Sequence, residues 1–505
     1  MDCLRRVRSN IGLPAGSRHS FRPTVNTGMI GVMKHLARAL LFLLFVVCFA
    51  VEAAAQTSPP SLIVLITIDQ FRADYLDRFR PQLHGGLARL SQHGAWFTNA
   101  HHDHAITETA PGHATLLSGR FPRSTGIVAN RVGVFDASYP LVGVPGGNGA
   151  SPRRFQGTTL VDWLRTKEAR SQTLSVSMKD RAAILPVGRS RSEVYWYFAD
   201  GHFTTSRYYR DTLPDWVERF NARNLPHTIT DIDETTLALA LDGLSALSLG
   251  SDSRTDLLAI SLSATDLIGH GYGPDSPEMA DNIVRVDRIL GAFLDSLFKL
   301  RDSARVAIVL TSDHGIGTIP ELAKSVTPAP VRLDAGELAS GLRSIVAAAN
   351  IDTNLVDLDQ QIVLADRNAL RGRTAALDSA LALFAKQVRA LPGVSRVDRF
   401  QDLLKGDTIN DPVTRRWVHQ LPARTNAEMV ITLTPLSIFG GLPATHGSPY
   451  DYDTHVPLIF YGPWFAPGHY PEFVRTVDLA PTLAAIAGVS PGEKIDGVVL
   501  KRALR

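Results

Sequence analysis

The sequence predicts an α/β fold in which helices sandwich a mostly parallel central sheet. Three observations predict this class. Five short runs are continuously apolar and rich in β-branched residues, which is typical of strands buried on both faces. Helical patterns over 73–80 and 86–93 follow the first run. Acidic residues and histidines gather at the strand ends, where ligands bind in open α/β sheets.

The five predicted strands cover 61–68, 173–177, 257–262, 306–311 and 456–461. Charged residues and histidines lie close to each of them. In chain order these are Asp69, Lys179, Arg181, Asp266, His270, Asp313, His314, His446 and His455. The carboxyl ends of parallel strands meet at one edge of a sheet, so we expect these side chains to form one site.

Two stretches are expected as additions to this sheet. Residues about 131–225 are rich in glycine, arginine and aromatic residues, and we expect them to form a cap over the site. Residues about 325–435 predict a small α+β insertion. Its elements are a helix over 335–349, a strand over 361–364, a helix over 375–390, and strands near Val394 and Val430. A last helix opens at 478–482 and runs to Ala487.

The first 55 residues are predicted to lie outside the folded domain, 56–505. Lys34 and Arg38 precede an apolar run over 39–51, and three alanines follow at 53–55. This pattern indicates a signal peptide cleaved after Ala55, preceded by an upstream extension. The apolar run is short for a transmembrane span. We therefore expect an exported protein, periplasmic or secreted, without a stable membrane anchor.

Removing this leader changes what the composition implies. Both cysteines, Cys3 and Cys48, lie in the leader, so the mature chain offers no thiolate as nucleophile or metal ligand. Of the 52 basic and 49 acidic residues, 7 and 2 lie in the leader, which leaves 45 basic and 47 acidic residues. A net charge of about −2 gives no reason to expect a nucleic-acid partner.

Residues 107–113, Thr-Glu-Thr-Ala-Pro-Gly-His, predict a nucleophile at the start of a helix. Pro111 suits a first helical turn, and Gly119 suits a left-handed helix end. A hydroxyl at Thr109 would face unpaired N–H groups and the positive end of the helix dipole, where a phosphoryl group binds well. The alternative is that Thr109 only caps the helix.

Two sequence pairs suggest metal binding. Asp266 and His270 are four residues apart, so on a helical turn they share one face and can bind one ion. Asp313 and His314 are followed by Gly315, which permits a turn that directs neighbouring side chains toward two ions. Each pair alone has a simpler explanation, a helix cap or ion pair for the first and a surface turn for the second.

Asp69 adds a carboxylate, and His446 adds an imidazole from a glycine-flanked loop, with His455 as the competing candidate. Nitrogen and oxygen ligands without thiolates suit Zn²⁺ better than Mg²⁺ or Ca²⁺. Two ions about 4 Å apart would hold both the attacking and the leaving oxygen of an in-line displacement. A bound metal would also lower the pKa of the Thr109 hydroxyl.

These residues, in this order, resemble the alkaline phosphatase superfamily, in its nucleotide pyrophosphatase/phosphodiesterase branch. They look most like the bacterial PafA-type alkaline phosphatases with a threonine nucleophile. The resemblance covers nearly all of the mature chain and implies an alkaline phosphatase-like fold. The motifs that carry it are 69–76, 109–113, Asp266 with His270, 313–315 and 446–449.

The resemblance implies a role for each residue. Thr109 would be the phosphorylated nucleophile. Two zinc ions would be held by two ligand sets. One set is Asp69, Thr109, Asp313 and His314, and the other is Asp266, His270 and His446. Asn130, Lys179 and Arg181 would bind the phosphate oxygens.

A phosphate monoester is a dianion, which the Lys179 charge and the Arg181 fork would neutralise. A diester carries one charge fewer and needs an apolar slot for its second substituent. The alternative for Lys179 and Arg181 is a solvated turn paired with Asp180.

The expected function is therefore an exported di-zinc alkaline phosphatase that acts on small-molecule phosphate monoesters through a phosphothreonine. One alternative is a nucleotide pyrophosphatase/phosphodiesterase with the same metals, in which the aromatic residues 195–197 stack on a base. A sulfatase is disfavoured, because residue 109 is threonine and the mature chain has no cysteine. A third alternative, a non-catalytic binder of zinc or phosphate esters, does not explain why every ligand and the nucleophile are present.

Overall fold

The computed structural model describes residues 58–146, 148–198, 201–223, 228, 230–370 and 372–505. The predicted signal peptide lies outside these residues. All elements below belong to one compact unit, Pro59–Arg505. Among the described residues, no helix is both long and apolar enough to cross a membrane.

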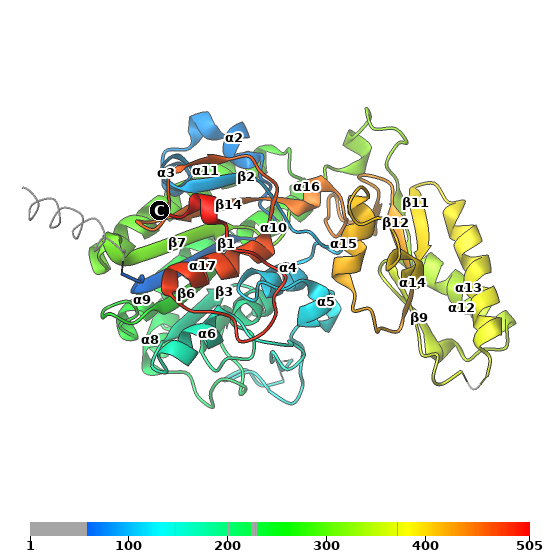
Figure 1. Cartoon of the computed structure of the whole chain (residues 1–505), viewed down its shortest axis with the longest axis horizontal. Coiled ribbons are helices and arrows are strands. Elements are labelled where there is room, and N and C mark those ends of the chain that lie inside the picture. Colours follow the sequence, from blue (N-terminus) through cyan, green and yellow to red (C-terminus); the bar gives the residue numbers. More distant parts are fainter. Residues whose placement is uncertain (1–57, 147, 199–200, 224–227, 229, 371) are drawn as a thin grey trace, which may run out of the picture. The chain divides into compact units, whose positions relative to one another are not determined.

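A ten-stranded, mostly parallel sheet forms the centre of this unit (Figure 1). Its central strand β1 (Leu62–Ile68) is fully buried and pairs in parallel with β6 and β7. The strand order is β15-β2-β14-β7-β1-β6-β3-β4-β5, with β16 beside β2. The other bounds are β2 (Ala95–His101), β3 (Thr173–Ser177), β4 (Glu193–Tyr197), β5 (Phe203–Thr204), β6 (Asp256–Leu262), β7 (Val306–Thr311), β14 (His455–Tyr461), β15 (Gly468–Tyr470) and β16 (Val474–Arg475).

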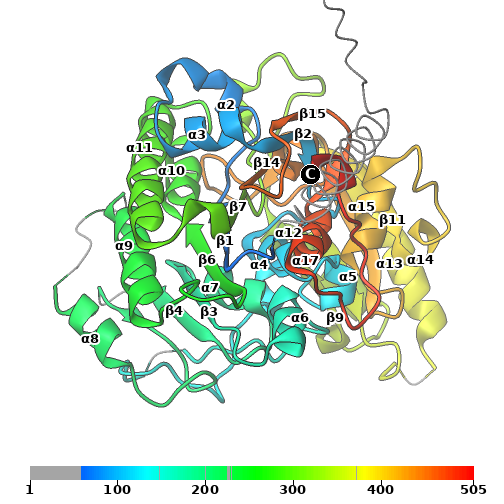
Figure 2. The same cartoon turned by 60° about the vertical axis from the view of Figure 1, so that its left-hand side comes forward.

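Helices cover both faces of this sheet, as the sequence predicts (Figure 2). Alternate side chains of β1 point to opposite faces, so Val64 packs with one group of helices and Leu65 with the other. The Val64 face meets α3 (Gly86–His93), α9 (Asp231–Ala246) and α11 (Pro277–Leu300). The Leu65 face meets α4 (Thr109–Leu116), α6 (Leu160–Lys167), α7 (Asp180–Ile184) and α17 (Leu479–Ala487). Two large apolar cores result.

The stretch 131–225 differs from the expected cap, because much of it belongs to the central sheet. β3 pairs in parallel with β6, and β4 pairs in parallel with β3. Tyr195 and Trp196 are 0% and 3% exposed and pack on opposite faces of β4. These aromatic residues stabilise an outer strand rather than covering the site. The helix α8 (Asp215–Asn221) follows them.

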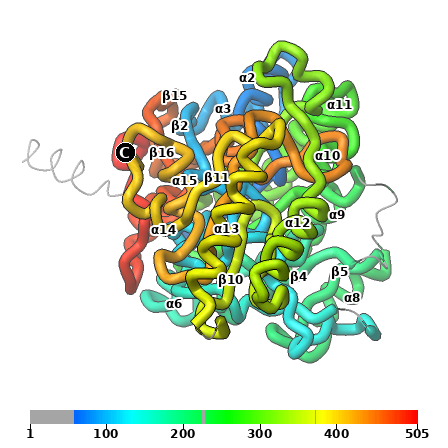
Figure 3. The backbone as a smooth tube through the Cα atoms, turned by 90° about the vertical axis from the view of Figure 1, so that its right-hand side faces the viewer, coloured from blue at the N-terminus to red at the C-terminus, as the bar shows by residue number. Residues whose placement is uncertain are grey.

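The stretch 325–435 folds around a separate four-stranded antiparallel sheet in the order β11-β12-β10-β9. Its strands are β9 (Val356–Asp359), β10 (Ile362–Ala365), β11 (Val394–Arg399) and β12 (Ala427–Leu433). One face carries α12 (Ala335–Ala348) and α13 (Thr374–Arg389), which lie side by side in Figure 3. The other face carries α14 (Phe400–Leu403) and α15 (Pro412–Gln420) and packs on residues 105–106, just before α4.

Short elements complete the unit. A two-stranded sheet joins β8 (Arg332–Leu333) to β13 (Ile438–Phe439). The remaining α-helices of the described residues are α2 (Tyr75–Arg78), α5 (Pro122–Thr125), α10 (Ala264–Tyr272) and α16 (Asp451–Thr454), and several short 3-10 helices accompany them.

Candidate active site

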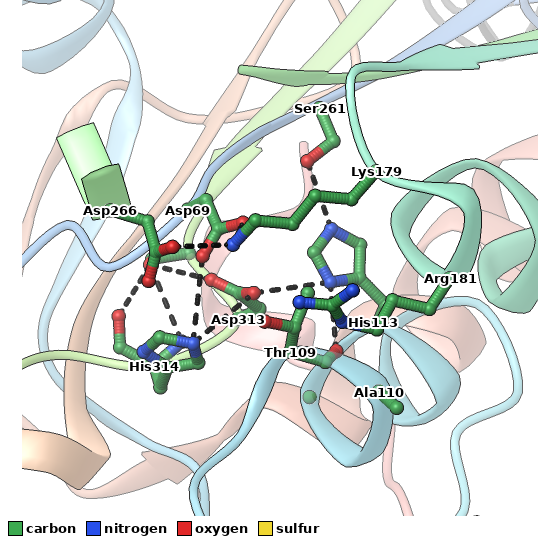
Figure 4. A network of polar contacts seen from close by, with 12 residues as sticks. Asp69, Thr109, Ala110, His113, Lys179, Arg181, Ser261, Asp266, Asp313 and His314 are labelled. Carbon is green, nitrogen blue, oxygen red and sulfur yellow. Dashed lines mark hydrogen bonds and ion pairs between the residues drawn. The ribbon is translucent and has the colours of Figure 1, made fainter. Parts of the chain in front are cut away.

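Many of the predicted site residues lie together at the carboxyl edge of the central sheet (Figure 4). Asp69 follows β1 directly, Lys179 follows β3, Asp266 follows β6 and Asp313 follows β7. Because β14 runs antiparallel to β7, its start lies at this same edge. This direction explains why His446 precedes its neighbouring strand while the other residues follow theirs.

The helix α4 begins at Thr109, and Glu108 occupies its N-cap position. The Glu108 carboxylate accepts hydrogen bonds from the backbone N–H of Asn130 and from Nε2 of Gln360, both at 2.6 Å. Thr109 is therefore the first helical residue and not the cap. Its side chain is buried at the positive end of the helix dipole.

Close packing holds this helix against the end of β7. A Cβ atom added to Gly112 would lie 2.2 Å from the carbonyl oxygen of Asp313, so a glycine is required there. The Nδ1 atom of His113 lies 3.0 Å from the carbonyl oxygen of Thr109 and 3.2 Å from Oδ2 of Asp313. Its Nε2 atom lies 3.0 Å from Oγ of Ser261. His113 thus fixes the helix that begins at Thr109 to two strand ends (Figure 4).

Three histidines share one hydrogen-bond pattern. In His270, His314 and His446, Nδ1 lies 3.0, 3.0 and 2.7 Å from a backbone carbonyl oxygen. The carbonyls belong to Ala444, Gly315 and Thr107, respectively. A carbonyl only accepts, so Nδ1 carries a proton in each histidine, and in the neutral imidazole Nε2 presents a lone pair. Burial lowers the pKa of His314 and His446, which favours this neutral form. This arrangement is typical of histidines that bind a metal through Nε2.

Each of these Nε2 atoms faces a carboxylate oxygen. His270 and His446 lie 3.3 and 3.7 Å from Oδ1 of Asp266. His314 lies 3.5 Å from Oδ1 of Asp69, and both atoms are buried without a hydrogen-bond partner. A lone pair that faces an anionic oxygen is repulsive unless a proton or a metal cation lies between the two atoms. The donors of Asp266, His270 and His446 lie within 4.8 Å of one another, as do those of Asp69, Asp266 and His314. The site therefore fits metal binding.

Buried charged side chains pair with one another in the rest of the site. The Nζ atom of Lys179 lies 2.5 Å from Oδ2 of Asp69 and 2.6 Å from Oδ2 of Asp266, and its side chain is 8% exposed. Burial raises the pKa of Asp69, and the nearby Asp266 and Asp313 carboxylates raise it further. Burial lowers the pKa of Lys179, but the carboxylates outweigh this effect and keep it above its ordinary value. The site thus stabilises cations strongly.

Lys179 is therefore not in a solvated turn. Arg181 is more open, and its guanidinium lies 3.7 Å from the Asp180 carboxylate, so the expected alternative describes Arg181 only in part. Burial raises the pKa of Glu108, while its hydrogen bonds and the charge of Arg181 oppose the rise. Arg181 therefore lies close enough to act on Glu108, the N-cap residue of α4.

The structure brings His446 to the metal-ligating group and leaves His455 outside it. The His446 ring stacks on His314 with a centroid distance of 3.7 Å. His455 instead stacks on His101, and its Nε2 atom lies 2.9 Å from the carbonyl oxygen of Thr98. His446, and not His455, therefore belongs to a group of side chains that could hold a metal ion.

Comparison with known proteins assigns the family. The model of the type I phosphodiesterase / nucleotide pyrophosphatase family matches residues 63–377, more than half of the chain. The chain belongs to this family. The match spans Asp69, Thr109, Asp266 in α10 and Asp313, and it extends into the four-stranded antiparallel sheet.

Within this family, three relatives are informative. Alkaline phosphatase PhoK of Sphingomonas is 29% identical, over 92% of this chain and 97% of PhoK. The crystal structure of alkaline phosphatase PafA aligns with a TM-score of 0.80 at 24% identity, over 89% of this chain and 99% of PafA. Murine ectonucleotide pyrophosphatase / phosphodiesterase 5 aligns with a TM-score of 0.55 at 19% identity, over 86% of this chain and 97% of its own. The alkaline phosphatase-like fold is thereby confirmed.

Sequence reasoning missed one residue that links both ligand groups of this family member. Gln70 has a φ of 64°, unusual for a residue other than glycine. Its backbone N–H donates to Oδ1 of Asp313 at 3.1 Å, and its Nε2 donates to Oδ1 of Asp266 at 2.8 Å. A Cβ at Gly269 would lie 1.7 Å from Oε1 of Gln70, so glycine makes room for it. In the sequence, the position of Gln70 directly after Asp69 was the signal that could have identified it.

Proposed function

We propose that this protein is an exported, zinc-dependent alkaline phosphatase that hydrolyses phosphate monoesters. One observation carries the proposal: two cationic side chains, Lys179 and Arg181, accompany the metal-ligating cluster and the buried Thr109. A monoester dianion needs this extra positive charge. Relatives named alkaline phosphatases that span nearly the whole chain support the same activity.

We assign the ligands as two sets. Asp69, Thr109, Asp313 and His314 would hold one zinc ion, and Asp266, His270 and His446 the other. The three Nε2 atoms that are turned toward carboxylates, together with those carboxylates, support zinc as the metal. When bound, zinc would supply positive charge that lowers the pKa of a hydroxyl and stabilises the oxygens on both sides of the phosphorus.

The chain's own groups then do the rest. Oγ1 of Thr109 loses its proton and attacks phosphorus, the bond from phosphorus to the alcohol oxygen breaks, and that oxygen takes up a proton and leaves as the alcohol. Water then cleaves the phosphothreonine, which restores the threonine hydroxyl and releases phosphate. Lys179 and Arg181 neutralise the non-bridging oxygens. Oδ1 of Asn130 accepts from the backbone N–H of Ala110 at 2.8 Å, so its Nδ2 group is the donor that serves a phosphate oxygen.

The test compares an aryl monophosphate with an aryl phosphodiester as substrates of the zinc-loaded protein. We expect a higher kcat/KM for the monoester, and a loss of that preference when Lys179 and Arg181 are replaced together. A strong preference for the diester in the wild type would contradict the proposal. Retained turnover in Thr109→Ala would show that this site is not catalytic.

A nucleotide pyrophosphatase activity is the second candidate, because the family includes such enzymes. Its sequence argument was a base stacked on the aromatic residues 195–197. Tyr195 and Trp196 are buried in the central sheet, so they offer no stacking face to a nucleotide. Release of pyrophosphate from nucleoside triphosphates at rates matching monoester hydrolysis would favour this candidate.

A further inference from the structure

A cavity of about 310 Å³ adjoins the site. The part of the fold built on the central sheet contributes Glu108, His270, His446 and Tyr452 to its wall. The opposite wall consists of the turn between β9 and β10 and of the segment 433–439, which belong to or directly follow the insertion 325–435. Substrate that occupies the cavity would therefore contact both parts of the fold.

The cavity lies on one side of the metal-ligating cluster. His270 and His446 line it, whereas the Asp69, Asp313 and His314 group does not. In an in-line displacement, the leaving oxygen departs opposite the attacking oxygen. With Thr109 grouped with Asp69 and Asp313, the leaving alcohol departs toward His270 and His446. This step rests on the proposed function.

Charge is divided between the two sides. Lys179 and Arg181 do not line the cavity, and its described lining contains no lysine or arginine. It does contain two buried acids, Glu108 and Asp453, which are 6% and 1% exposed. Oδ2 of Asp453 accepts from the N–H and Oγ of Ser448, while its Oδ1 is buried without a hydrogen-bond partner.

Apolar side chains form much of the remaining wall, including Leu433, Leu436, Ile438 and Phe439. We propose that this cavity is the leaving-group subsite and selects monoesters of uncharged or cationic alcohols with an apolar face. An alcohol that carries a further phosphate or carboxylate would bring its negative charge beside the two acids, and no lysine or arginine of the described lining would contact it. Burial raises the pKa of both acids, so this repulsion increases as the pH rises above neutral. The cavity thus repels nucleoside polyphosphates, and it also favours its own substrates through apolar contact.

The test is run above the raised pKa of Asp453, at about pH 8.5, so that this carboxyl is ionised. It uses three esters with phenol groups of similar acidity: the phosphates of tyramine (cationic), 4-ethylphenol (neutral) and 4-hydroxyphenylacetate (anionic). We expect kcat/KM for the anionic ester to fall about 10-fold below the neutral one, as one buried like charge implies. The cationic ester should equal or exceed the neutral one. Equal rates for the anionic and neutral esters would overturn the proposal.

Two variants locate the effect. Phe439→Lys adds a cation to the cavity wall and should recover most of the loss on the anionic ester, whereas Leu442→Lys, at a nearby 51% exposed position outside the lining, should not. Asp453→Asn should lower the ratio of cationic to anionic ester severalfold. No shift in either cavity variant would overturn the proposal, and Asp453→Asn keeps the test valid if the lysine variant does not fold.

A binding measurement separates this inference from the proposed function. NMR saturation transfer to tyramine and to 4-hydroxyphenylacetate is recorded on the protein with and without added zinc. We expect transfer to tyramine, reduced in Asp453→Asn, and little to the anion. Failure to hydrolyse 4-ethylphenyl phosphate would refute the phosphatase assignment alone, whereas equal binding of both alcohols would refute the subsite alone.

Discussion

Replacing Lys179 with alanine removes the buried ammonium group from the phosphate side of the site. In the structure this group contacts the carboxylates of Asp69 and Asp266 at 2.5 and 2.6 Å and is 8% exposed, so solvent screens it poorly. A monoester carries one negative charge more than a diester. The substitution should therefore penalise monoesters more than diesters.

The size of the penalty follows from Coulomb's law. Two unit charges about 4 Å apart interact by about 4 kcal/mol at an effective dielectric constant of about 20. The two carboxylates beside Lys179 share its charge, so we halve this value to about 2 kcal/mol for the extra charge of the monoester. The ratio of monoester to diester kcat/KM should fall about 30-fold.

The assay measures both substrates with wild type, Lys179→Ala and the control Lys386→Ala, which removes an exposed lysine of α13. Zinc content is determined for each sample, because Lys179 contacts two proposed ligands. A ratio in Lys179→Ala equal to that of the control, at equal zinc content, would refute the assignment of Lys179 to the phosphate.

Three further predictions concern the metal ligands and one buried acid. His446→Ala should lose about one zinc ion per chain by elemental analysis, while His455→Ala should keep both; the reverse result would reassign the ligand. Gln70→Ala should weaken zinc binding about 10- to 100-fold in a chelator competition, because Gln70 orients two carboxylates; unchanged affinity would show that it has no such role. Burial raises the pKa of Asp453 to about 7. Between about pH 4 and 7, the folded protein therefore retains a proton that the unfolded chain releases, so the contribution of Asp453 to the free energy of unfolding falls as the pH rises. In urea unfolding over this pH range, Asp453→Asn should remove about 1 kcal/mol per pH unit of that fall. If the free energy of unfolding of the variant and of the wild type depended on pH in the same way, the burial argument would be contradicted.

The sequence predicted the strands whose apolar composition directly reflects their burial. β1 and β7 are continuously apolar because both of their faces are buried, and their bounds agree with the predicted runs within one residue. The same logic located the metal-ligating candidates, because residues after such strands reach one edge of the sheet. His446 was found through its neighbouring glycine, which has a φ of 106° in the structure.

Features set by distant partners could not be predicted. Gln70 hydrogen-bonds to Asp313, which lies 243 positions away in the sequence, and Gln360 hydrogen-bonds to Glu108, which lies 252 positions away. The aromatic strand β4 suggested a surface cap, since its pairing with β3 is a tertiary contact that no local pattern encodes. The antiparallel direction of β14 was equally hidden, although it places His446 at the site.

The most direct test of the whole account is to trap the phosphorylated enzyme. The zinc-loaded protein is mixed with an aryl monophosphate, quenched in acid and analysed by peptide mass spectrometry. We expect one phosphate on Thr109 in the wild type, and neither phosphate nor turnover in Thr109→Ala. Steady turnover in Thr109→Ala, or phosphate found on another residue, would contradict the assignment of Thr109 as the nucleophile.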